Sequence, residues 1–198
     1  MPADVLSSSA FTEYTVETAP PAARRFLTAT RDHLGYLPAA MARMVASPQL
    51  TEGFLKLTAI FDSTTLDPLA REVLVMTVAT RNGCHVCVAM HTATLTALGA
   101  DPELIAALRG SGPLADERLD AIRVFTLRVL ETAGDVGDAA LREFLARGYT
   151  TQNALEVVLG IGTYTMSTLA NRLTGAPVDE QLAAHAWHPG DIVQHGGK

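Results

Sequence analysis

The sequence has little of several features that mark common protein classes. It has only two cysteines, too few for the disulfide framework of a small secreted domain. Acidic residues outnumber basic ones, and the formal net charge of −6 argues against a basic surface for nucleic acid or an anionic membrane. No apolar run is long enough to cross a bilayer. We therefore expect a cytoplasmic protein that binds neither nucleic acid nor a membrane.

The sequence also lacks the alternation of apolar and polar residues that marks a β-strand. Helix signals recur instead. Ser47, Asp67 and Asp101 each stand directly before a proline, an order typical of an N-cap followed by the first helical position. A chain of 198 residues fits one domain with an ordinary core. We therefore expect an all-α fold, a helical bundle of about nine or ten helices in a single domain.

The two ends of the chain differ in composition from the middle. Residues 1–19 are polar and lack both a helical period and the basic flank and apolar run of a signal peptide, so we expect an N-terminal arm. Residues 20–186 hold the expected helical domain. Residues 187–198 are rich in glycine and histidine and are predicted to form a flexible C-terminal tail.

Both cysteines lie near the start of one predicted helix, from Cys84 to about Leu98. At about 100° per residue, Cys84, Cys87 and His91 fall within an arc of roughly 60°. Cys84 stands at the helix start, where unpaired N–H groups and the helix dipole favour a thiolate. The Cys-x2-Cys spacing has the reach for a disulfide, and His91 is placed to exchange a proton with a thiol. The pattern indicates a thiol redox centre.

Glu72 belongs to the preceding predicted helix, residues 68–81, which is apolar nearly all round and is therefore expected to be buried. Asp67 serves as the N-cap and Ala70 takes the capping-box position, so Glu72 has no capping role. A carboxylate among apolar neighbours suits general base work. Because the Asn82-Gly83 turn folds the two helices together, we expect Glu72 to approach the cysteines and complete a proton relay with His91.

The pattern Glu72-x11-Cys84-x2-Cys87-x3-His91 resembles the signature of the AhpD-like alkylhydroperoxidases, within the carboxymuconolactone decarboxylase superfamily. The resemblance implies an all-helical enzyme that assembles as a dimer, trimer or hexamer and reduces organic hydroperoxides without a metal or another cofactor. It implies that Cys87 is the peroxidatic thiol and that Cys84 resolves it as a disulfide. An external dithiol, of lipoyl type in the family, would then reduce that disulfide. One position departs from the pattern, because Val86 stands where some members have a second histidine.

Other interpretations of the same residues remain open. Cys84, Cys87 and His91 with Glu72 as a fourth ligand would also suit zinc, and the cysteines would also be compatible with inert burial. A redox-sensing or stress-response module would use the same pair with little turnover. A cofactor-free lactone decarboxylase is a further alternative, although its chemistry needs no paired thiols.

A few residues outside the pattern carry weaker expectations. We expect His85 to be exposed and Glu156, in an apolar run, to be buried in a structural hydrogen bond. Gly160 and Gly162 are expected to let their helix pack closely against the active-site helices or another subunit. Tyr164 and Thr168 are expected to be ordinary core residues, with lining of the pocket as the alternative.

Overall fold

The computed structural model describes residues 10–191 and shows an all-helical single domain. Nine α-helices and three short 3-10 helices occur in this range, with no β-strand. The α-helices are α1 (Arg24–Leu34), α2 (Ala39–Met44), α3 (Pro48–Asp62), α4 (Pro68–Arg81), α5 (His85–Ala97), α6 (Pro102–Arg109), α7 (Glu117–Thr132), α8 (Gly137–Ala146) and α9 (Thr151–Thr174). The predicted fold class and approximate number of helices are confirmed.

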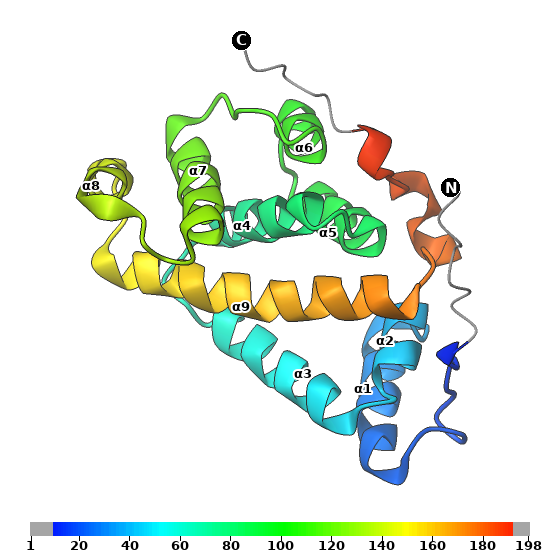
Figure 1. Cartoon of the computed structure of the whole chain (residues 1–198). Coiled ribbons are helices and arrows are strands. Elements are labelled where there is room, and N and C mark those ends of the chain that lie inside the picture. The colour runs from blue at the N-terminus through cyan, green and yellow to red at the C-terminus, as the bar shows by residue number, and fades with distance from the viewer. Residues whose placement is uncertain (1–9, 192–198) are drawn as a thin grey trace, which may run out of the picture.

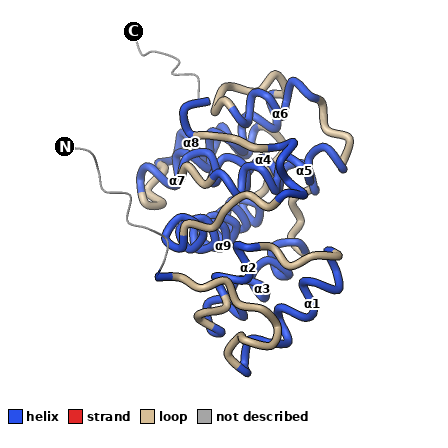
Figure 2. The backbone as a smooth tube through the Cα atoms, turned by 90° about the vertical axis from the view of Figure 1, so that its right-hand side faces the viewer, coloured by secondary structure: helices blue, strands red, loops and turns tan. Residues whose placement is uncertain are grey.

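The long helix α9 crosses the middle of the molecule, as Figures 1 and 2 both show. Helices α4 to α8 lie on one side of α9, and α1 to α3 lie on the other. The 3-10 helices Pro21–Ala23, Glu180–His185 and Pro189–Asp191 belong to the segments that precede α1 and follow α9. Helix α9 therefore links the two groups of helices.

The predicted helix boundaries follow from capping, and the structure confirms the three aspartate and serine caps. The side chain of Ser47 accepts from Leu50 N–H, and that of Asp67 accepts from Ala70 N–H, while that of Asp101 accepts from Glu103 N–H at the start of α6. Each cap satisfies one of the N–H groups left free in a first helical turn. At α9 the cap is Thr150, which forms a capping box with Asn153.

Helix α4 is the buried helix that its apolar sequence predicts. Every residue from Val73 to Thr80 is buried, and α4 packs against α5, α7 and α9. Glu72, at the start of this buried stretch, keeps a side chain that is only 14% exposed. The expected desolvation of Glu72 is therefore confirmed.

The first residue of the predicted C-terminal tail, Trp187, packs against the helical domain. The Trp187 side chain is buried, and its Nε1–H donates to the carbonyl of Arg109 at 3.0 Å. The Arg109 guanidinium in turn donates to the carbonyls of His185 and Ala186. A buried indole with a satisfied N–H anchors the segment, which composition alone does not reveal. Residues 192–198 lie outside the described range.

Candidate active site

The two cysteines lie at the junction of α4 and α5. Cys84 is the N-cap of α5, and its Sγ accepts from Cys87 N–H at 3.4 Å. The two Sγ atoms are 2.6 Å apart with both thiols free. The turn before α5 places Gly83 at φ +62°, where a Cβ would also collide with the Arg172 guanidinium. The sequence therefore brings the thiols together through a helix cap preceded by a glycine turn.

The two thiols have opposite acid–base properties. The hydrogen bond from Cys87 lowers the pKa of Cys84, with further help from the amide of Asn171 and the charge of Arg172, against the effect of burial. The neighbouring Cys84 and burial raise the pKa of Cys87 well above its usual 9.0. When the pair loses a proton, the charge therefore settles on Cys84 at the helix start. Cys87 needs a base to become a nucleophile.

Glu72 and His91 form the ion-pair geometry that the sequence predicts. Glu72 Oε2 lies 2.8 Å from His91 Nδ1, and both side chains are 14% exposed. A carboxylate at Nδ1 holds the proton on that nitrogen and leaves Nε2 to accept another. His91 lies one turn beyond Cys87 on α5, where side chains four residues apart are neighbours. The structure thus brings Glu72, Cys84, Cys87 and His91 into one site.

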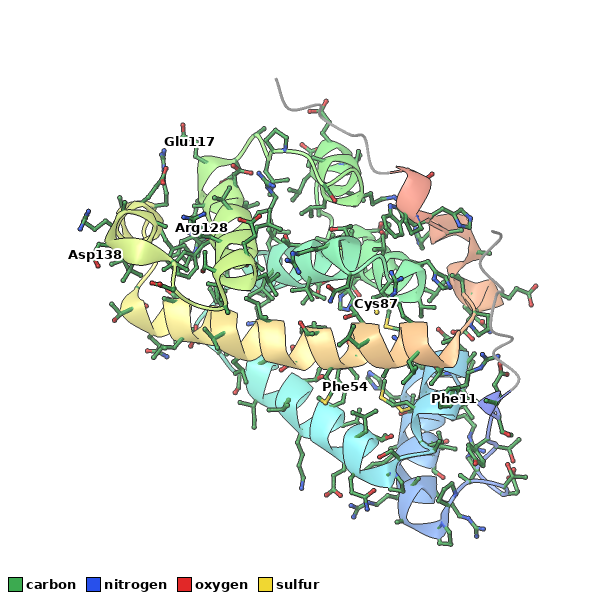
Figure 3. All side chains as sticks on the ribbon, in the orientation of Figure 1. Phe11, Phe54, Cys87, Glu117, Arg128 and Asp138 are labelled. Atoms are coloured by element: carbon green, nitrogen blue, oxygen red, sulfur yellow. The ribbon has the colours of Figure 1, made fainter. Side chains whose placement is uncertain are left out.

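A cavity of about 390 Å³ opens onto this site between the two groups of helices. Figure 3 labels Cys87 and Phe54 near opposite sides of α9, and both residues line the cavity. Its wall comes from α1, α2, α3, α5 and α9, and is mostly apolar. The lining residues are Phe26, Ala29, Thr30, His33, Leu34, Pro38, Ala40, Met41, Met44, Phe54, Leu55, Cys87, Met90, His91, Tyr164, Ser167 and Asn171. Of the two thiols, Cys87 is the one that faces this space.

Two residues of the site were not predicted as functional. Tyr164 is buried in the core, as expected, and it also lines the cavity, with its ring edge-to-face on His91 at 5.4 Å between centroids. Burial raises the pKa of Tyr164 well above its usual value, and the nearby Glu72 adds to the effect. Asn171 donates from Nδ2 to Cys87 Sγ at 3.3 Å. No motif links Asn171 to a cysteine 84 positions away, so only the fold reveals it.

The residues outside the four-residue pattern lie partly as expected. Glu156 is buried in a hydrogen-bond network, as predicted. Gly160 packs closely on Phe61 and on Leu74 of α4, while Gly162 is open to solvent. His85 was expected to be exposed but is half-buried, and burial lowers its pKa.

Two features are absent from residues 10–191. Within this range, no group of three or more His, Cys, Asp or Glu side chains has a geometry that could hold a metal ion. None of the helices in the same range is both long and apolar enough to span a membrane.

The fold and the paired thiols match one class of protein. The carboxymuconolactone decarboxylase family profile matches residues 48–126, a range that includes Glu72, Cys84, Cys87 and His91. This match and the fold confirm the resemblance to the AhpD-like carboxymuconolactone decarboxylase superfamily and support an enzyme of that superfamily. No curated protein sequence matches the chain.

Three solved structures share the fold. A peroxidase-related protein with an alkylhydroperoxidase AhpD core, from Ralstonia eutropha JMP134, is 18% identical, with a TM-score of 0.76, 87% of this chain covered and 93% of that one. A peroxidase-related protein from Silicibacter sp. TM1040 is 17% identical, with a TM-score of 0.70 and coverages of 82% and 87%. The debrominase Bmp8 is 18% identical, with a TM-score of 0.67 and coverages of 87% and 92%. At these identities the likeness is one of fold.

Proposed function

We propose that the protein is a thiol peroxidase that reduces organic hydroperoxides through a disulfide cycle between Cys84 and Cys87. The observation that carries the proposal is the placement of Cys87 at the wall of an apolar cavity, beside both a partner thiol and a Glu72–His91 pair. A cavity of this size and polarity suits a hydroperoxide with a sizeable apolar organic group.

The first half of the cycle oxidises Cys87. His91, oriented by Glu72, removes the Cys87 proton, and the thiolate attacks the terminal oxygen of the hydroperoxide. The O–O bond breaks, and the proton held by His91 passes to the departing alkoxide to give an alcohol. The products are an alcohol and a sulfenic acid at Cys87, and His91 has returned to the state in which it began the cycle.

The second half of the cycle returns the thiols. Cys84 attacks the sulfenic sulfur, expels water and forms the disulfide. An external dithiol then attacks the disulfide and is itself oxidised. Attack at Cys87, the sulfur that faces the cavity, releases Cys84 as the leaving thiolate, and a lowered pKa makes it the better leaving group.

A rapid oxidation experiment tests the proposal. Reduced protein would be mixed anaerobically with one equivalent of cumene hydroperoxide and followed by intact mass. We expect rapid loss of two hydrogens in the native chain and no reaction in Cys87→Ser. Cys84→Ser is the matched control, because it should gain one oxygen as a sulfenic acid that dimedone traps. Slow oxidation of the native chain at the rate of a free thiol would contradict the proposal and favour redox sensing.

Reductive dehalogenation is a second candidate. The debrominase Bmp8 shares the fold, and a cysteine-to-alanine variant of that protein is known in complex with 2,3,4-tribromopyrrole. The apolar cavity next to Cys87, with Met41, Met44 and Met90 in its wall, would accept a flat halogenated ring. Incubation of the reduced protein with a brominated pyrrole distinguishes this activity, because bromide release should accompany disulfide formation.

The assembly and the reductant also belong to the proposal. The family resemblance supports a homo-oligomer and a lipoyl-type dithiol as electron donor. A sedimentation measurement at several protein concentrations tests the first. Steady-state turnover with dihydrolipoamide, compared with a monothiol at equal thiol concentration, tests the second.

A further inference from the structure

Asn171 presents an unused hydrogen-bond acceptor next to the reactive sulfur. Asn171 is buried, with only 5% of the residue exposed. Nδ2 donates to Cys87 Sγ, but within the described part of the chain Oδ1 accepts no hydrogen bond. A buried acceptor without a partner is costly, so such a group calls for an explanation.

The position of Asn171 indicates what its free oxygen would meet. Asn171 lines the same cavity as Cys87 and His91, and it stands two turns of α9 beyond Tyr164. A ligand placed for attack by Cys87 therefore lies against this amide. A hydroperoxide carries an O–H donor on its terminal oxygen, the atom that the thiolate attacks.

We propose that Asn171 selects and orients the hydroperoxide group, with Nδ2 holding the Cys87 thiolate and Oδ1 accepting the O–H of the terminal oxygen. This inference rests on the proposed peroxidase function. In the reaction, the Cys87 S–O bond forms as the O–O bond breaks, and the hydrogen held by Oδ1 stays on the oxygen that becomes the sulfenic acid. The alkoxide leaves on the opposite side and takes its proton from His91. Asn171 thus directs attack to the hydroxyl-bearing oxygen.

The two roles of the amide predict different consequences for two electrophiles. Loss of the Nδ2 donor removes a hydrogen bond that stabilises the Cys87 thiolate. Less thiolate is then present at a given pH, and any reaction at Cys87 is slower. Loss of the Oδ1 acceptor slows only a substrate with an O–H group. Methyl methanethiosulfonate is a small, uncharged thiolate reagent without an O–H group. It gives a Cys87 methyl disulfide and releases methanesulfinate.

The experiment compares both reagents in a Cys84→Ser background, where Cys87 is the one remaining thiol. Rates with cumene hydroperoxide and with methyl methanethiosulfonate would be followed by quenched intact mass between pH 6 and pH 10. For Asn171→Leu we expect the hydroperoxide rate to fall by about 10- to 100-fold more than the methanethiosulfonate rate at every pH. The methanethiosulfonate profile should shift to higher pH because the thiolate has lost its donor.

Controls keep the outcome clear. Thr163→Val also removes a buried polar group from α9, where Thr163 Oγ1 donates to the Leu159 carbonyl, and it should leave both rates unchanged. Asn171→Ala provides a second variant if the leucine does not fit. Equal slowing of both reactions, or no slowing of either, would overturn the role of Oδ1. A parent protein that reacts with methanethiosulfonate at a normal rate but ignores the hydroperoxide would instead refute the proposed function.

Discussion

Two glutamates stand in similar apolar helical sequences, but the structure uses them differently. Glu72 lies in Leu69–Val75 of α4 and Glu156 in Ala154–Leu159 of α9, and each is followed directly by valines and a leucine. Glu156 Oε1 and Oε2 together accept from Thr65, Gln152 and Asn153 at distances between 2.9 and 3.0 Å. Within residues 10–191, the side chain of Glu72 has one hydrogen-bond partner, the titratable imidazole of His91.

The hydrogen-bond partners of the two glutamates separate a structural carboxylate from one that takes part in chemistry. Neutral amide and hydroxyl donors fix Glu156 as an anion, and its hydrogen bonds hold its pKa below the usual 4.5 despite burial. A carboxylate so fully bonded has no remaining capacity for proton transfer. Glu72 instead pairs with the imidazole of His91, which lines the cavity, so it can orient a group that transfers protons. The partners, rather than burial, distinguish the two.

The largest effect is expected from the isosteric replacement of Glu72 by glutamine. Glu72→Gln should slow oxidation of Cys87 by cumene hydroperoxide by about 100-fold, because the amide no longer orients His91 as a base. The unfolding free energy should change little. Stopped-flow oxidation and urea denaturation of the same preparation check both parts, and an unchanged rate would remove Glu72 from the relay.

The same replacement at Glu156 should lower the stability of the fold and leave the oxidation rate of Cys87 nearly unchanged. Glu156→Gln should lower the unfolding free energy by about 1–3 kcal/mol, because an amide cannot accept at both ends from the donors of Thr65 and Asn153. The oxidation rate of Cys87 should stay within about two-fold of the native rate. Urea denaturation measures the first quantity. A large rate loss without destabilisation would show that the comparison between the two glutamates is wrong.

The sequence predicts the fold well because its signals are local. Asp67 followed by Pro68 sets the start of α4, and Cys84 after Asn82-Gly83 sets the start of α5. Caps and breakers act within one turn of a helix, so they can be read without tertiary information. Glu72 lies on α4, and the cysteines and His91 lie on the next helix, α5. Because a short turn joins these helices, the sequence predicts that the four residues lie near one another.

What the sequence does not reveal depends on distant segments. Asn171 reaches Cys87 only because α9 crosses α5, and Tyr164 reaches His91 for the same reason. Trp187 is anchored by the Arg109 carbonyl at the end of α6. None of these residues has a motif of its own, and each obtains its role from packing between elements far apart in the chain.

Acid titration of stability tests whether the charge of Glu156 carries its structural role. Hydrogen bonds lower the pKa of Glu156 in the folded state below its ordinary 4.5, so its contribution to stability is present above that pH and is lost as pH falls through the folded pKa. The difference in unfolding free energy between the native chain and Glu156→Gln should therefore be constant from about pH 6 to pH 7 and shrink below about pH 4.5. Urea denaturation at a series of pH values measures it. A difference that does not depend on pH would mean that the charge is irrelevant.

A further expected effect concerns the close approach of α9 to α4, one turn beyond Glu156. A Cβ at Gly160 would lie 2.6 Å from Phe61 Cε2 and 2.8 Å from Leu74 Cδ2, whereas one at Gly162 meets open space. Gly160→Ala should therefore cost about 1–3 kcal/mol through overpacking, while Gly162→Ala should stabilise the helix by about 0.5–1 kcal/mol. Thermal or urea denaturation distinguishes the signs. Because Leu74 lies only two residues from Glu72, Gly160→Ala should also disturb the oxidation rate, and Gly162→Ala should not. Equal effects of the two alanines on stability would mean that α9 does not rely on Gly160 to approach α4, and that the two glutamate segments are positioned independently.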